Sequence, residues 1–174
     1  MKKTTETTFL CAPFYKKAET PAPFDDVILF SDGEFITGLI FDNPGAERNF
    51  GQCENARLPV FDKAERWLAL YFSGKNPPVD FGVKTPRCTP FQKCVYEILR
   101  SVPYGTTISY GELARRAELK LGKKTSARAV GGAVGANPLC IVVPCHRVVG
   151  KGGDAVGYSG GINNKLALLA LENA

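Results

Sequence analysis

Apolar and polar residues follow two different patterns in the first part of the chain. Residues 27–41 contain two runs of β-branched and aromatic residues around Asp32-Gly33, which is a strong hairpin signal. Residues 61–74 instead place apolar side chains at helical spacing, with Gly74 as the expected C-cap. The apolar positions of this helix are Phe61, Ala64, Trp67, Leu68, Tyr71 and Phe72. The first part is therefore predicted to be a small α+β unit with a packed core, and no residue in it stands out as catalytic.

Residues 75–90, KNPPVDFGVKTPRCTP, form the most linker-like stretch of the chain. Proline and glycine recur there, and both residues interrupt regular secondary structure. We predict a domain boundary near residue 85, with an N-terminal domain over residues 1–85 and a C-terminal domain over residues 86–174.

The second part is predicted to be mostly helical with one strand. Thr89-Pro90 caps a helix in which Phe91, Cys94, Val95, Ile98 and Leu99 share a face. SYGE, residues 109–112, reads as a capping box that opens a second helix, and residues 125–138 contain a third. The run LCIVV, residues 139–143, is predicted to be a short buried strand that Pro144 interrupts, so that Cys145 lies on the bend.

The third of these helices is rich in glycine. Gly131, Gly132 and Gly135 each cost about 1 kcal/mol relative to alanine in a helix interior. They leave a nearly smooth face from which Arg128 protrudes, as in a helix-turn-helix that lies in a groove of DNA. The alternative is a helix that packs closely against another helix through its glycines.

Charge is distributed unevenly between the two parts. The formal net charge is +5, but residues 1–85 carry 10 lysines and arginines against 12 acidic residues, whereas residues 86–174 carry 12 against 5. A polyanion such as nucleic acid is expected to meet the second part, although a solvated basic face without a partner would look the same. No apolar run is long enough to span a bilayer, and the start lacks the apolar core of a secretory signal, so an intracellular protein is expected.

The six cysteines show no CxxC pair and no regular spacing. In an intracellular chain, free thiols are expected rather than a disulfide framework. His146 is the only histidine, so a zinc site is poorly supported and no metal is expected.

Cys145 and His146 are adjacent in the sequence PCHRV. A thiol becomes nucleophilic as its thiolate, which needs a nearby base or positive charge. Neighbours in an extended strand point to opposite faces, so the two side chains would need a turn or a bridging water to interact. A base also needs an orienting group, and the carboxylates available in the second part are Glu97, Glu112, Glu118, Asp154 and Glu172. Taken alone, a cysteine at this position is more often a buried core residue than a catalyst, because free cysteine is among the most buried residue types.

Several short motifs occur together in one order. They are SYGELA, ARAVGGA, NP followed by PCHRV, GYSGG and a late LALE. In this combination, over residues 89–172, the chain resembles the O6-alkylguanine-DNA alkyltransferases. The resemblance implies an N-terminal ribonuclease-H-like α/β domain followed by a mostly helical C-terminal domain. The latter would contain a helix-turn-helix and an active-site cysteine on a short strand or turn.

The resemblance also implies a set of functional residues. Cys145 would accept the alkyl group, His146 would take its proton through water, and Glu172 would hold the imidazole. Asn137 would fix the turn around Cys145, and Tyr110 would bind the flipped guanine and help to rotate its phosphate. Arg128 would enter the base stack, beside further DNA-binding residues at Ser109, Ala127, Gly131 and Gly132. The substrate pocket would contain Val148, Tyr158, Ser159 and Lys165.

The implied activity is that of a methylated-DNA–protein-cysteine S-methyltransferase that acts once per molecule. Its partner would be double-stranded DNA carrying O6-alkylguanine, bound through the minor groove, with O4-alkylthymine repaired less efficiently. No cofactor, metal or membrane is expected, and the protein would be a monomer in the cytoplasm, or in the nucleus of a eukaryote. The zinc site that some members carry in the N-terminal domain is not expected, because histidine is absent there. Cys140 is expected to be inert, the alternative being that it tunes the pocket.

Two other functions remain as alternatives. Alkyltransferase-like proteins bind lesions without repairing them and lack the acceptor cysteine, whereas this chain has Cys145. A Cys-His hydrolase would need an oxyanion hole and would turn over many substrates.

Overall fold

A computed structural model describes residues 12–44, 53–85 and 87–174 of the chain. Cys11 and the N-terminal stretch considered for a secretory signal lie outside these residues. In the part that is described, the fold is mixed α+β, and no helix is long and apolar enough to cross a membrane.

The first part contains a sheet in the order β3-β2-β1-β4. Its strands are β1 (Phe14–Ala18), β2 (Val27–Ser31), β3 (Ile36–Phe41) and β4 (Glu54–Asn55). β2 is antiparallel to both β1 and β3, and β4 is parallel to β1. The predicted hairpin at Asp32-Gly33 is confirmed, since β2 and β3 pair with Val27 opposite Phe41. Gly33 has a φ of 110°, which a residue with a side chain rarely adopts.

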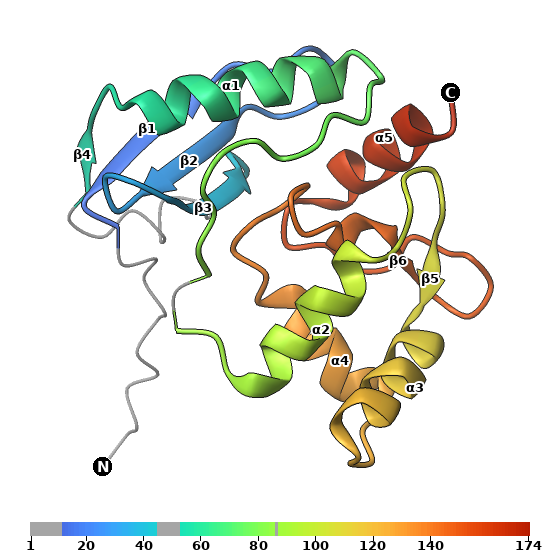
Figure 1. Ribbon diagram of the computed structural model, residues 1–174. Coiled ribbons are helices and arrows are strands. Elements are labelled where there is room, and N and C mark those ends of the chain that lie inside the picture. The colour runs from blue at the N-terminus through green and yellow to red at the C-terminus, as the bar shows by residue number, and fades with distance from the viewer. Residues whose placement is uncertain (1–11, 45–52, 86) are drawn as a thin grey trace.

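Helix α1 (Pro59–Phe72) lies across this sheet (Figure 1). Its first residue is a proline, whose fixed φ suits the first turn of a helix. The helix predicted from apolar spacing is confirmed, and all of its predicted core positions are buried. The C-cap is Ser73 rather than the expected Gly74, which follows it with a φ of 82°.

The described residues of the second part form four α-helices and a small parallel sheet. The helices are α2 (Pro90–Arg100), α3 (Tyr110–Leu121), α4 (Ala127–Gly135) and α5 (Ile162–Glu172), and the strands are β5 (Ile108–Ser109) and β6 (Val148–Val149). The predicted helices at Thr89-Pro90, at SYGE and in the glycine-rich segment are confirmed. Thr89 and Gln92 form a complete capping box.

The capping box predicted at SYGE forms only in part. The Ser109 hydroxyl accepts a hydrogen bond from the Glu112 amide at 3.1 Å. The Glu112 carboxylate does not return to Ser109 but binds Arg115 and Arg116 on the next turn. The guanidinium groups of Arg115 and Arg116 therefore bind the Glu112 carboxylate, which in a complete capping box would accept from the Ser109 backbone amide.

The predicted strand over residues 139–143 is wrong. Leu139 makes an isolated bridge to Leu39 of β3, and the chain then turns, with Ile141 at a φ of 68°. Backbone hydrogen bonds from Val142 to Cys140 and from Val143 to Leu139 close this turn. Asn137 satisfies further backbone groups inside the segment, so the run of β-branched residues needs no partner strand. The strand of this region is β6, which begins after Cys145.

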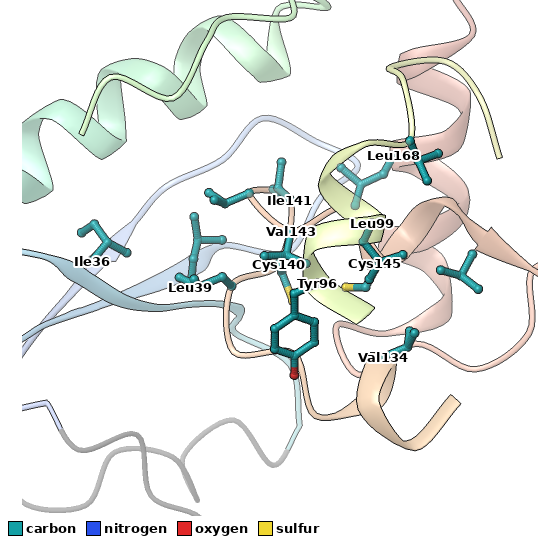
Figure 2. Packing of buried hydrophobic residues seen from close by; sticks show 14 of the residues in the cluster. Ile36, Leu39, Tyr96, Leu99, Val134, Cys140, Ile141, Val143, Cys145 and Leu168 are labelled. Carbon is teal, nitrogen blue, oxygen red and sulfur yellow. The ribbon is translucent and has the colours of Figure 1, made fainter. Parts of the chain in front are cut away.

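One buried cluster joins the two parts of the molecule. It includes Ile36 and Leu39 of β3 together with Leu99 of α2, Val143 and Leu168 of α5. In Figure 2, Leu39, Leu99 and Val143 lie close to Cys140 and Cys145, whereas Ile36 lies farther from them. Two backbone hydrogen bonds link Leu39 to Pro138 and Cys140, so β3 anchors the start of this segment. The boundary near residue 85 and the ribonuclease-H-like assignment stay predictions.

Candidate functional site

Cys145 begins a single 3-10 turn, Cys145–Arg147, directly after Pro144. The residue is only 1% exposed, so its sulfur is enclosed by protein. The Asn137 side-chain amide donates a hydrogen bond to this sulfur at 3.0 Å. The same amide holds the Val143 carbonyl at 2.9 Å, while its oxygen accepts from the Leu139 backbone. Asn137 therefore closes the turn and contacts the thiol at the same time.

Cys140 supplies a second contact to Cys145. The two sulfurs point into the same space in Figure 2, and the Cys140 thiol donates to Cys145. This hydrogen bond lowers the pKa of Cys145, burial opposes it, and the Asn137 amide lowers it further. The pKa of Cys140 is raised, because its proton is held against Cys145 and because it is buried. The expectation that Cys140 is inert stays a prediction, and the lowered pKa of Cys145 supports the alternative that Cys140 tunes the pocket.

His146 is fully buried beside Cys145 in the same turn. Its Nε2 lies 2.8 Å from Oε1 of Glu172 at the end of α5. Its Nδ1 is buried and has no hydrogen-bond partner within the described residues. Burial lowers the pKa of His146 more than the Glu172 carboxylate raises it, so the imidazole is neutral at physiological pH.

Glu172 is surrounded by donors. Arg147 donates hydrogen bonds from Nε to Oε2 at 2.9 Å and from Nη2 to Oε1 at 2.8 Å. The Gly105 backbone amide donates a further hydrogen bond to Oε2 at 3.2 Å. Burial alone would raise the pKa of Glu172, but hydrogen bonds from His146 and Arg147 hold it below its ordinary value. The carboxylate is therefore ionised and acts only as an acceptor.

Two residues of this network were not predicted from the sequence. Arg147 belongs to the PCHRV motif, and its position two residues after Cys145 is the one sequence feature that could have pointed to it as a site residue. Tyr71, on α1, donates its hydroxyl to Oε1 of Glu172 at 2.6 Å. From its helical spacing, Tyr71 could be predicted only as a core residue, because its partner Glu172 lies 101 residues away in the sequence.

The four residues predicted to form the substrate pocket differ in burial and in their contacts. The Tyr158 hydroxyl is buried beside the Cys140 and Cys145 thiols, and burial together with these sulfurs raises its pKa. Ser159 is exposed, and its backbone carbonyl accepts from Asn43 at 3.2 Å. Lys165 is fully buried and donates to the Val148 carbonyl at 2.6 Å and to the Val156 carbonyl at 2.9 Å. Lys165 thus ties β6 to the loop that carries Tyr158.

The predicted DNA-binding residues lie on α3 and α4. Tyr110 is half-buried at the start of α3, and burial followed by the charge of Cys145 raises its pKa. Ala127, Arg128 and Gly132 are exposed on α4, whereas the Ser109 hydroxyl is used to cap α3.

The glycines of α4 do not serve a tight internal contact. A Cβ added at Gly131 would lie 3.7 Å from the Tyr110 ring, an ordinary separation, and one added at Gly132 or Gly135 would meet nothing within 4 Å. The alternative that α4 packs against another helix through its glycines is therefore wrong for Gly132 and Gly135.

An open cavity of about 780 Å³ lies elsewhere, between β1 and α1, and is lined by residues such as Lys17, Glu65 and Phe72. It contains none of the residues around Cys145, so it plays no part in that chemistry. Within residues 12–44, 53–85 and 87–174, no group of histidine, cysteine and carboxylate side chains is placed to hold a metal.

Comparisons with known proteins agree on one family. Residues 90–174 match the family described as 6-O-methylguanine DNA methyltransferase, DNA binding domain. A methylated-DNA–protein-cysteine methyltransferase of Haemophilus influenzae is 38% identical over 152 residues, which cover 87% of this chain and 83% of the relative. A relative of the same name from Salmonella typhimurium is 47% identical over 105 residues, covering 60% of this chain and 59% of the relative.

Solved structures extend the likeness to the fold. The crystal structure of Mycobacterium tuberculosis O6-methylguanine methyltransferase has a TM-score of 0.79 at 38% identity, with 92% of each chain covered. A structure of M. tuberculosis OGT in complex with DNA has a TM-score of 0.78 at 37% identity, again with 92% of each chain covered. On this similarity of sequence and fold, the chain belongs to the family of methylated-DNA–protein-cysteine methyltransferases and is an enzyme of that class.

Proposed function

We propose that this protein repairs duplex DNA by moving the alkyl group of O6-alkylguanine irreversibly to Cys145, and that it accepts O4-alkylthymine less efficiently. The observation that carries the proposal is the thiol itself. Cys145 has a lowered pKa, contacts Asn137 and Cys140, and adjoins a neutral histidine whose Nδ1 has no partner among the residues that the structure describes. A relative of similar fold was solved in complex with DNA, which supports DNA as the partner.

The transfer is a nucleophilic displacement. The Cys145 proton passes through a water to Nδ1 of His146, while Glu172 holds Nε2 at 2.8 Å. The sulfur then attacks the alkyl carbon, so that an S–C bond forms as the C–O6 bond breaks and negative charge moves onto the guanine. The raised pKa of Tyr110 keeps its hydroxyl protonated, so that Tyr110, with Ser159, donates to this charge. The imidazolium proton balances the charge of the released guanine.

The product is a thioether, and nothing in the proposed site can remove its alkyl group. Each molecule therefore acts once. This sets the protein apart from a Cys-His hydrolase, whose thioester intermediate is cleaved by water and whose thiol is regenerated.

The target base must leave the duplex to reach the sulfur. In our proposal α3 and α4 form a helix-turn-helix, and the Ala127, Gly131 and Gly132 face of α4 lies in the minor groove. Arg128 fills the base stack in place of the extruded nucleotide, and Ser109 and Tyr110 meet the backbone beside it. The basic balance of residues 86–174 supports this surface.

The extruded base would lie between Tyr110 and the loop that carries Tyr158 and Ser159. Because Cys145 is only 1% exposed, this loop moves when the base enters. Lys165 supports this loop through its hydrogen bond to the Val156 carbonyl. The Val148 carbonyl accepts a hydrogen bond from the exocyclic amine of guanine. That carbonyl now accepts from Lys165 at 2.6 Å and has a second lone pair for the base. We further propose that the protein is a cytoplasmic monomer, or nuclear in a eukaryote, with the domain boundary near residue 85.

The test is the intact mass of the protein after it is mixed with excess duplex containing one O6-methylguanine, followed by peptide mapping. A gain of one methyl group on Cys145, stopping at one per molecule, is expected. Cys145→Ser is expected to bind the duplex without any gain in mass. An unchanged wild-type mass with tight binding would instead indicate a lesion sensor, and the proposal would be abandoned.

A further inference from the structure

The Glu172 carboxylate, which orients His146, accepts a hydrogen bond from a hydroxyl in the first part of the chain. Tyr71 lies in the last turn of α1, and its hydroxyl donates to Oε1 of Glu172 at 2.6 Å. The same hydroxyl oxygen lies 3.4 Å from Nε2 of His146. Tyr71 is 2% exposed, so water does not compete for these contacts. One hydroxyl therefore touches both members of the Glu172–His146 pair.

The directions of these hydrogen bonds follow from the protonation states. Glu172 is ionised and can only accept, and burial together with Glu172 raises the pKa of Tyr71, so the phenol keeps its proton. That single proton is committed to the carboxylate. Both oxygens that face Nε2 of His146 are then acceptors, which places the imidazole proton on Nε2. Nδ1, which has no hydrogen-bond partner in the described part of the chain, is left as the basic nitrogen.

The hydroxyl also limits how strongly Glu172 attracts a protonated imidazole. Oε1 accepts from His146, Arg147 and Tyr71, so its negative charge is shared among three donors. A carboxylate that loses a donor becomes a stronger base and favours the imidazolium. With Tyr71 in place, His146 stays neutral and able to accept a proton.

We propose that Tyr71 is a positioning residue for alkyl transfer: its hydroxyl fixes the Glu172 carboxylate and keeps His146 neutral with its proton on Nε2. This inference rests on the proposed function, in which His146 takes the proton of Cys145. It gives the N-terminal part of the chain a role in the chemistry beyond folding.

The surroundings of Tyr71 allow its hydroxyl to be separated from its ring. The ring packs against Trp67 at 5.6 Å between centroids and against Tyr104 at 6.1 Å. Tyr71→Phe keeps these ring contacts and removes only the oxygen. Tyr104 is a matched control in the same cluster, because its hydroxyl is also buried but has no hydrogen-bond partner in the described part of the chain.

The experiment compares the wild type, Tyr71→Phe and Tyr104→Phe. The rate of methyl transfer from a duplex containing O6-methylguanine is measured by intact mass under single-turnover conditions across a pH series. His146 is the only histidine, so its ring resonances in ¹⁵N-labelled protein report its tautomer and its titration without assignment by mutagenesis. Duplex affinity and the unfolding midpoint are recorded for each variant.

The wild type is expected to show the Nε2–H tautomer. Tyr71→Phe should transfer methyl about tenfold more slowly at neutral pH, as expected for a lost hydrogen bond to a charged group. Its His146 titration should move to higher pH by about one unit. Its duplex affinity should not change, and Tyr104→Phe should match the wild type in rate and titration.

Two results would overturn the inference. One is an Nδ1–H tautomer in the wild type, which needs no variant to fold. The other is a Tyr71→Phe protein with the rate and His146 titration of Tyr104→Phe. Failure of the proposed function is distinguishable, because the wild type would then gain no methyl group on Cys145 whatever the state of His146.

Discussion

The side-chain amide of Asn137 donates to the Cys145 sulfur at 3.0 Å and to the Val143 carbonyl at 2.9 Å. The residue that closes the loop is thus also a direct contact of the thiol. Any change at Asn137 therefore alters the stability of the segment and the acidity of Cys145 together, and the two effects can be measured separately.

Asn137→Ala is expected to lower the free energy of unfolding by about 2–4 kcal/mol, because the Leu139 amide and the Val143 carbonyl lose buried partners. It should also move the reaction of Cys145 with iodoacetamide to higher pH, since the amide lowers the thiol pKa. Chemical denaturation and peptide mapping measure the two effects. Asn173→Ala, at an exposed asparagine, is the control and should change neither. Equal unfolding curves for both variants would contradict the role assigned to Asn137.

Cys140→Ala is expected to raise the pKa of Cys145, because the hydrogen bond from Cys140 is what lowers it most. A hydrogen bond of about 1 kcal/mol corresponds to a transfer rate about fivefold lower at neutral pH. The difference should disappear at high pH, where the thiol is ionised in both proteins. Cys94→Ala removes a buried thiol of α2 instead and should leave the pH dependence of Cys145 unchanged. A parallel loss of rate at every pH would mean that Cys140 acts through packing alone.

Glu172→Gln should destabilise the protein in a pH-dependent way. The folded pKa of Glu172 lies below its ordinary value of 4.5, so its contribution is complete above that pH and is lost as the pH falls. Removing one partner of a buried ion pair costs about 3–5 kcal/mol of unfolding free energy. The free energy of unfolding of Glu172→Gln should therefore lie below that of the wild type by this amount at pH 7, and the difference should become smaller in acid. Unfolding curves from pH 7 to pH 3 test this. Glu97→Gln breaks the exposed pair with Lys120 and should have little effect at any pH.

Arg128→Ala should slow repair of duplex DNA far more than reaction with free O6-methylguanine base. Without a side chain to fill the stack, extrusion of the base costs more, and a loss of about tenfold or greater is expected on duplex. Arg66→Ala removes the same charge from an exposed site on α1 and is the control. Equal losses on duplex and on free base would exclude the role proposed for Arg128.

Local patterns were enough to predict the hairpin at Asp32-Gly33 and the helices. In each case the signal lies within a few residues, as with the apolar stripe of α1 and the Thr89 cap. Residues 139–143 were wrongly predicted as a strand, because their β-branched composition favours extended structure. What folds them instead is the side chain of Asn137, whose hydrogen bonds no propensity describes.

The same limit applies to the candidate site. Cys145, His146 and Glu172 could be named from motifs, but Tyr71 could not. Its ring obeys the core spacing of α1, and only its hydroxyl reaches Glu172, across 101 residues of sequence. A hydroxyl on a core face carries no pattern of its own, so its partner is visible only after the two parts of the chain have packed together.

The open face of α4 allows the proposed DNA contact to be tested without harm to the fold. An added Cβ at Gly132 meets nothing within 4 Å, so Gly132→Ala should raise the free energy of unfolding by about 1 kcal/mol through helix propensity. Gly132→Leu should also fold, but its side chain would stand between the helix and the floor of the minor groove. We expect its dissociation constant for duplex DNA, measured at one fixed salt concentration, to rise about tenfold. Its Cys145 should still react with iodoacetamide like the wild type, because the thiol is not involved. If Gly132→Leu bound duplex as tightly as Gly132→Ala, a different surface of the protein would have to meet the DNA.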